Sequence, residues 1–237
     1  MPENVLVDRT DTDGSAWEYY EKIYGSRPDG KAFEFIFLSN SDGKYATLKN
    51  APSNLADFEF RGDVIFNFKK GYNGQSRYEV FEKHLREIED EKLKNDCLES
   101  LSVCLDKSQT NFNFSLFPST GKMQQAKQGI GNDRGDTFIW ALNQYYVNNV
   151  GILLNHSTQE NIELLIDFLD LFKVDGAQKS IYKYCKEFYQ IEDGKFIDKL
   201  LESGGKAIKS AEEAKNYIDL ALEFWEKREA YFNQLNN

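Results

Sequence analysis

The chain contains few of the residues on which several common classes of protein depend. It has three cysteines, two histidines and four prolines in 237 residues. Cys97, Cys104 and Cys185 form neither a CxxC pair nor an even set, which argues against a disulfide framework and against structural zinc. His84 and His156 fit no metal-ligand or catalytic-triad spacing. Acid–base chemistry by histidine is therefore not expected.

Long apolar runs and an excess of positive charge are also lacking. The first fifteen residues have neither the basic nor the apolar block of a signal peptide, and no run approaches a membrane span, which predicts a cytoplasmic protein without a membrane partner. The net charge of -10 makes the surface repel phosphate backbones, so broad duplex nucleic-acid binding is disfavoured. An acidic surface can still dock on a basic protein partner, and a few basic side chains in a cleft can bind an anion.

The hydrophobic fraction of 41% and the aromatic fraction of 14% supply material for a large core. We predict an α+β protein in which an antiparallel sheet-bearing N-terminal half packs against a helical C-terminal half. Residues 1–15 are expected to be a flexible arm, and residues 16–237 a single domain. Within that domain, 16–118 is the sheet-rich part and 119–237 the helical part.

Alternating apolar residues predict the sheet, which follows a short amphipathic helix over 15–24. Phe33, Phe35 and Phe37 alternate with smaller or polar residues, and a turn leads to a second strand over 45–48. The triplet Arg61-Gly62-Asp63 is interpreted as a hairpin corner between two further strands. A last strand is predicted over 109–117.

Helical spacing and capping boxes predict the remaining elements. A Ser and a Glu three residues later mark three helix starts, because the two side chains cap each other's backbone N–H groups. These pairs are Ser76 with Glu79, Ser157 with Glu160, and Ser210 with Glu213. Further helices are expected over 90–105, 136–147, 178–189 and 195–201, with Cys97 and Cys104 on the buried face of the first and Gly204-Gly205 as a break after the last.

One loop carries most of the potential chemical groups. The predicted strand ends at Phe117-Pro118 and is followed by a glycine-containing loop that opens into an aromatic helix. The loop's candidate site residues are Lys122, Gln125, Lys127, Asn132, Asp133, Arg134 and Asp136. Basic side chains beside a helix N-terminus are suited to bind phosphate or carboxylate. We therefore predict an anion site in which Lys122, Lys127 and Arg134 hold the ligand and Asp133 or Asp136 orients it.

Two other interpretations of this loop stay open. In the structural one, Asp136 caps the helix, Arg134 pairs with Asp133 or another carboxylate, and the glycines turn the chain. In the metal one, Asp133 and Asp136 hold Mg²⁺ and act catalytically, but no third acidic ligand can be identified. The loop matches neither a Walker A motif nor GxGxxG, so nucleotide binding has no motif support and the sequence identifies no particular cofactor.

The same stretch resembles a bacterial family of domains of unknown function. The resemblance rests on Phe117-Pro118, Gln125-Ala126-Lys127, the segment from Asp133 to Asp136, and Tyr145-Tyr146. The family is found as stand-alone cytoplasmic proteins, and the resemblance implies no established activity. Lys127 stands where the family has an arginine, which would weaken a bidentate grip on an anion.

Two functions follow as hypotheses. In the first, the loop Gln125–Asp136 of a cytoplasmic bacterial protein binds an anionic ligand, such as a nucleotide or an RNA end, in a defence or toxin-type effector. In the second, the loop is structural and the chain is a non-enzymatic acidic interaction protein, for example an inhibitor that binds a phage or host protein. The sequence leaves open whether the chain is an enzyme.

Overall fold

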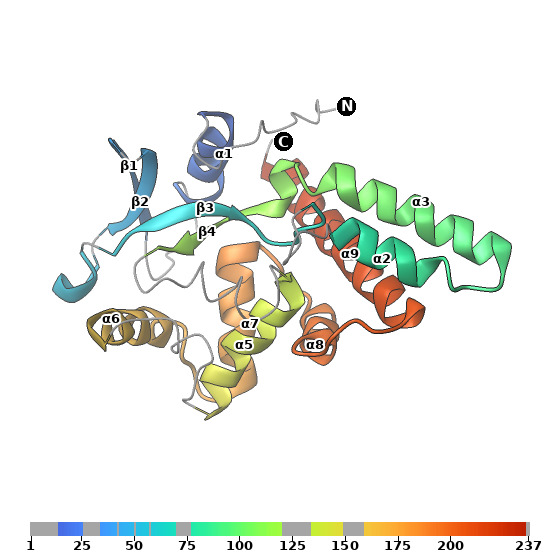
Figure 1. Ribbon diagram of the computed structural model, residues 1–237. Coiled ribbons are helices and arrows are strands. Elements are labelled where there is room, and N and C mark those ends of the chain that lie inside the picture. Colours follow the sequence, from blue (N-terminus) through green and yellow to red (C-terminus); the bar gives the residue numbers. More distant parts are fainter. Residues whose placement is uncertain are drawn as a thin grey trace.

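A computed structural model describes residues 14–25, 34–41, 43–49, 51–56, 58–69, 77–119, 134–148 and 159–235. The sheet consists of β1 (Glu34–Asn40), β2 (Gly43–Lys49), β3 (Phe60–Val64) and β4 (Phe114–Pro118). These strands lie in the order β1-β2-β3-β4, and each neighbouring pair is antiparallel (Figure 1). The predicted α+β class, with a sheet-bearing first half and a helical second half, is confirmed.

The helices occupy most of the rest of the described chain. They are α1 (Gly14–Tyr24), α2 (Arg77–Leu85), α3 (Glu91–Lys107), α5 (Gly135–Asn148), α6 (Gln159–Asp170), α7 (Ala177–Tyr184), α8 (Gly194–Ser203) and α9 (Ala211–Leu235). The short elements are the 3₁₀ turns η1 (Ser53–Leu55) and η2 (Asn111–Asn113) and the π-helix η5 (Cys185–Tyr189). None of the helices in these ranges combines the length and the apolar character that crossing a bilayer requires.

Of the three predicted capping boxes, the one at the start of α9 lies wholly within the described residues. At α9, the Ser210 hydroxyl accepts a hydrogen bond from the Glu213 N–H at 3.2 Å, and the Glu213 carboxylate accepts one from the Lys209 N–H at 2.7 Å. At α3, the Asp90 carboxylate accepts the Leu93 N–H at 2.8 Å. Ser76 and Ser157, predicted to cap α2 and α6, lie outside the described residues.

The hairpin corner predicted at Arg61-Gly62-Asp63 is wrong, because these residues lie inside β3. They pair with Phe117, Leu116 and Ser115 of β4. The glycine meets a packing requirement, since a Cβ at position 62 would lie 2.5 Å from the Tyr20 hydroxyl oxygen. The close approach of α1 to the sheet, not a turn, explains this glycine.

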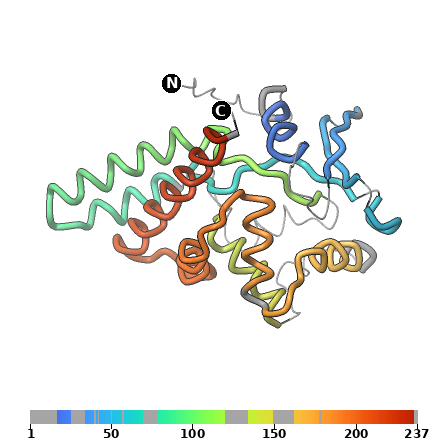
Figure 2. Tube along the Cα trace, turned by 180° about the vertical axis from the view of Figure 1, so that it is seen from behind, coloured from blue at the N-terminus to red at the C-terminus, as the bar shows by residue number. Residues whose placement is uncertain are grey.

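Helices cover both faces of the β3–β4 pair. All five residues of β4 are buried. Gly62 is paired with Leu116, and side chains alternate between faces along a strand, so position 62 and Phe117 face opposite sides of the sheet. Position 62 lies against Tyr20 of α1. The Phe117 ring lies 5.4 Å from the Phe138 ring of α5. Figure 1 shows α1 above these strands and α5 and α7 below them. Helices α2, α3 and α9 lie side by side beyond one end of the sheet, as the reverse view in Figure 2 also shows.

A buried arginine protects the outer edge of β4. The Asn113 carbonyl points toward β3 and accepts the Ile65 N–H at 2.8 Å, so the flanking carbonyls point away from the sheet. Nη1 of Arg228, from α9, donates to the carbonyl oxygens of Phe112 and Phe114 at 2.6 and 2.8 Å. Edge strands need such protection against unwanted pairing. Here one side chain occupies two carbonyls at this edge, that of Phe114 in β4 and that of Phe112 just before it.

The three cysteines are free and buried. Cys97 and Cys104 lie on the buried face of α3, as predicted, and Cys185 begins η5. Burial raises the pKa of each thiol. A high pKa leaves little thiolate to react, so these cysteines are core residues rather than nucleophiles.

Candidate functional site

Arg134 and Asp136 form a bidentate ion pair at the start of α5. The Arg134 Nε lies 3.1 Å from Asp136 Oδ1, and its Nη2 lies 2.5 Å from Oδ2. Arg134 is 8% exposed and Asp136 is fully buried. Two parallel N–H···O bonds of this kind are the strongest arrangement available to an arginine and a carboxylate.

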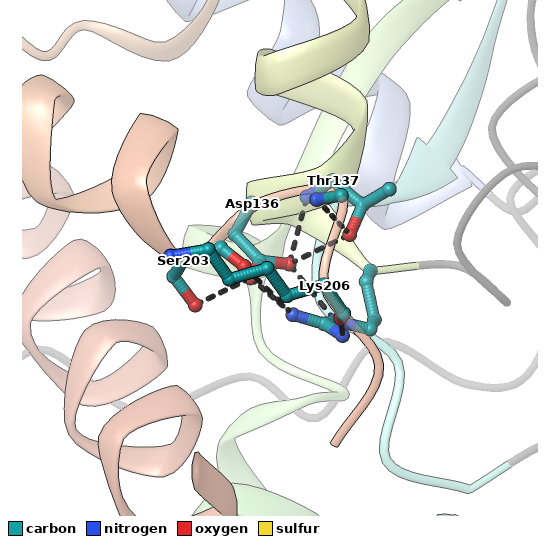
Figure 3. Close-up of polar contacts among 6 residues, drawn as sticks. Asp136, Thr137, Ser203 and Lys206 are labelled. Carbon is teal, nitrogen blue, oxygen red and sulfur yellow. Dashed lines mark hydrogen bonds and ion pairs between the residues drawn. The ribbon is translucent and has the colours of Figure 1, made fainter. Parts of the chain in front are cut away.

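Further donors occupy the Asp136 carboxylate. Oδ1 accepts the Thr137 N–H at 2.7 Å, and Oδ2 accepts the Ser203 hydroxyl at 2.8 Å (Figure 3). Because α5 begins at Gly135, Asp136 lies within the first turn and satisfies one of the N–H groups that a helix start leaves open. A negative side chain at this place also interacts favourably with the helix dipole.

The guanidinium of Arg134 ties α5 to α8 and α9. Its Nη1 donates to the Lys206 carbonyl, and its Nη2 lies 3.5 Å from the Ser203 carbonyl oxygen. The guanidinium carbon also lies 5.0 Å from the centre of the Tyr217 ring on α9. These contacts join segments about seventy residues apart in the sequence. We call the set Arg134, Asp136, Ser203 and the Lys206 carbonyl the clasp.

The clasp requires the chain after α8 to pass very close to α5. A Cβ on Gly204 would lie 2.4 Å from the Trp140 Cβ and 2.5 Å from the Asp136 carbonyl oxygen. Gly205 has a φ of +74° and its N–H donates to the Thr137 hydroxyl at 3.3 Å. The predicted break at Gly204-Gly205 is confirmed, and its physical reason is this close approach.

We expect Gly204→Ala to lower the free energy of unfolding by about 2 kcal/mol, because neither the Trp140 Cβ nor the Asp136 carbonyl can rotate away from the added methyl group. Denaturant unfolding followed by circular dichroism measures the change. Gly194→Ala, in the first turn of α8, is the matched control, since its nearest neighbour would be a Tyr182 ring atom at 3.3 Å. Equal stability of the two variants would contradict the steric argument.

A pocket opens beside the clasp, between α8 and α9. Its volume is about 300 Å³. It is lined by Arg134, Lys199, Glu202, Ser203, Lys206, Ala207, Ile208, Glu213 and Asn216. Arg134 has five N–H donors, and the contacts given above use four of them. One Nη1–H therefore has no partner among the residues that the structure describes.

The structure describes only part of the predicted site. Arg134 and Asp136 lie together in the clasp. Lys122, Gln125, Lys127, Asn132 and Asp133 lie outside the described residues, so their predicted roles stay predictions. The sequence did not point to Ser203 or Lys206 as neighbours of this loop. Only the glycine pair after Ser203 marked that segment as unusual.

The described residues contain no cluster of side chains suited to bind a metal ion. They contain no group of three or more His, Cys, Asp or Glu side chains placed to share one. The two Asp136 oxygens already accept hydrogen bonds from Arg134, Thr137 and Ser203. A cation at this carboxylate would have to displace the guanidinium.

Comparisons of the chain with protein families, with curated proteins and with solved structures found no match.

Proposed function

We propose that the chain binds a small anionic ligand in the pocket beside Arg134, and that the loop leading to Arg134 belongs to the same site. The observation that supports this best is the unused Nη1–H of a nine-tenths-buried arginine at a pocket that Lys206 also lines. Charge-assisted donors of this kind bind phosphate and carboxylate groups. In a bacterial cell the ligand would be a nucleotide or an RNA end, and the role that of a defence or toxin-type effector.

The charges around the pocket limit what the ligand can carry. Asp136 neutralises Arg134, and Lys199 lies 2.9 Å from Glu223. Among the described lining residues this leaves Lys206 as the main source of positive charge. Glu213 also lines the pocket, and the Lys209 N–H holds the pKa of its carboxyl below the usual range, so it stays ionised. These charges favour one anionic group over a polyanion. A volume of about 300 Å³ is likewise at the small end for ligand pockets.

We expect wild-type protein to bind a ribonucleoside monophosphate or inorganic phosphate in isothermal titration calorimetry. Lys206→Ala should bind it at least about tenfold more weakly, since a charge-assisted hydrogen bond contributes roughly 1.5–3 kcal/mol. This substitution keeps the backbone carbonyl that Arg134 uses. Lys209→Ala is the matched control, because Lys209 is exposed nearby and does not line the pocket. Absence of saturable binding, or equal affinity of all three proteins, would refute the proposal.

A second function is supported by the fact that most hydrogen-bonding groups of Arg134 and Asp136 already have partners within the protein. Arg134 and Asp136 use most of their hydrogen-bonding capacity on each other, on Thr137, on Ser203 and on the Lys206 carbonyl. This agrees with a structural role for the start of α5. The chain would then be a non-enzymatic interaction protein whose net charge of -10 attracts a basic partner. Rising salt would weaken such docking more than binding in the pocket, because docking depends on many exposed charges and the pocket on one exposed lysine and a buried arginine.

A further inference from the structure

The strand β1 presents an edge that nothing in the described chain covers. It is seven residues long and lies first in the sheet order, with β2 as its neighbour. Figure 1 shows it at the end of the sheet away from α2, α3 and α9. No described strand pairs with its outer side. An edge of this kind exposes backbone N–H and C=O groups that can pair with another strand.

The side chains of β1 make this edge unusually apolar. Ile36 and Leu38 are 42% and 41% exposed on one face of the strand. On the other face Phe35 is buried, and the Phe37 ring lies 5.8 Å from the Trp17 ring. β1 therefore adds apolar surface next to its open backbone, on the side that faces solvent.

The usual devices that prevent edge pairing are missing from β1. Natural edge strands carry Lys, Pro or a bulge. β1 contains neither Lys nor Pro, and its register with β2 runs without a bulge from Glu34 opposite Lys49 to Asn40 opposite Gly43. Its one charged residue, Glu34, lies 2.6 Å from the ammonium of Lys49. β4 differs in this respect, because Arg228 occupies the outward carbonyl of Phe114 and that of Phe112 just before the strand.

We propose that β1 pairs with β1 of a second copy of the chain, antiparallel and centred on Phe37. In this register Ile36 lies opposite Leu38 of the second copy, and the reverse pair follows by symmetry, so the exposed apolar side chains meet across the two-fold axis. Glu34 lies opposite Asn40 of the second copy, so no like charges meet. The two four-stranded sheets become one continuous sheet.

The sequence of β1 is complementary to itself, which identifies a second copy of the chain as the partner at this edge. Any partner strand could use the backbone, but the sequence of β1 is compatible with itself in a two-fold register, both in charge and in the apolar pairs. The chain as a whole carries a charge of -10, so two copies repel each other at long range. Salt screens that repulsion and should strengthen the dimer. This response is opposite in sign to that of an acidic surface docked on a basic partner.

Sedimentation velocity over a range of protein concentrations tests the pairing. We expect wild type to shift from monomer to dimer with concentration, and to do so at lower concentration in higher salt. Ile36→Lys and Leu38→Lys should each abolish the dimer over that range. Leu93→Lys should not, because Leu93 is equally exposed, at 42%, but lies on α3. Far-ultraviolet circular dichroism checks that each variant is folded.

Amide hydrogen exchange tests the pairing in the wild type alone, so the result does not depend on whether a variant folds. Protection of β1 amides should rise with protein concentration while protection of α3 amides stays constant. A wild type that is monomeric at every concentration and salt overturns the proposal. A dimer that survives both lysine substitutions, or that leaves β1 exchange unchanged, places the interface elsewhere and overturns it as well.

Discussion

Replacement of Asp136 by asparagine is expected to lower the free energy of unfolding by about 3–5 kcal/mol, the usual loss when one partner of a buried ion pair is removed. Asparagine keeps the shape of the side chain but removes the charge that compensates Arg134. The guanidinium is 8% exposed and would stay buried without a counter-charge. Guanidinium chloride unfolding gives the difference directly.

The surface pair Lys215–Asp219 is a matched control for this substitution. Its N···O distance is 2.5 Å, the same as that between Arg134 and Asp136, but its side chains are 42% and 52% exposed instead of 10% and 0%. Asp219→Asn should therefore cost less than about 1 kcal/mol, because water and salt screen exposed pairs. Similar losses in both variants would show that burial does not decide the strength of the clasp.

A double replacement, Arg134→Met with Asp136→Leu, separates the charge effect from the packing effect. It removes both charges and should recover part of the stability lost in Asp136→Asn, since apolar pairs of similar volume often replace buried ion pairs at little cost. The result also bears on function. If Asp136→Asn is as stable as wild type, the carboxylate is not needed for folding, and its predicted catalytic or ligand-orienting role gains weight.

Local sequence pattern predicted the elements well, because each depends on neighbouring residues. The capping box at Ser210 and Glu213 marked the start of α9 within one residue. The alternation of Phe33, Phe35 and Phe37 with smaller or polar residues marked β1. Such signals arise from helical and strand periodicity. In these elements the local preference and the tertiary packing favour the same structure.

The sequence could not predict how distant segments meet. Arg61-Gly62-Asp63 has the composition of a turn, but pairing with β4 makes it a strand. The Tyr20 side chain beside Gly62 explains the glycine. Arg228 lies in α9, and helical periodicity does not show that its donors reach the edge of β4. The clasp has the same origin, since no local pattern links Asp136 to Ser203.

Asn113 is the strongest example of a residue whose role depends on distant contacts. It is fully buried at the end of η2, next to the start of β4. Its Oδ1 accepts the Phe66 N–H at 2.8 Å and the Trp225 indole N–H at 3.0 Å. Its Nδ2 donates to the carbonyl oxygens of Phe66 and Ser108 at 2.6 and 2.9 Å. One amide thus joins the segment after β3, the end of α3 and α9.

Asn113→Asp should therefore lower the free energy of unfolding at pH 7 by at least about 4 kcal/mol, because it buries a charge and places an oxygen against two carbonyls. Burial raises the pKa of the introduced carboxyl above its unfolded value of about 4. The loss should be smallest below that value, where the carboxyl is protonated in both states, and should grow as pH rises toward the folded pKa. Urea unfolding of variant and wild type from pH 4 to pH 7 measures this.

The exposed Asn148 at the end of α5 provides the control, because its amide makes only a surface hydrogen bond to Gln144 at 3.1 Å. Asn148→Asp should change stability by no more than about 0.5 kcal/mol, with little dependence on pH. A similarly small, pH-independent loss in Asn113→Asp would mean that the segments around β4 hold together without this amide. A large loss that diminishes toward pH 4 would identify the four bonds of Asn113 as the link between the sheet and α9.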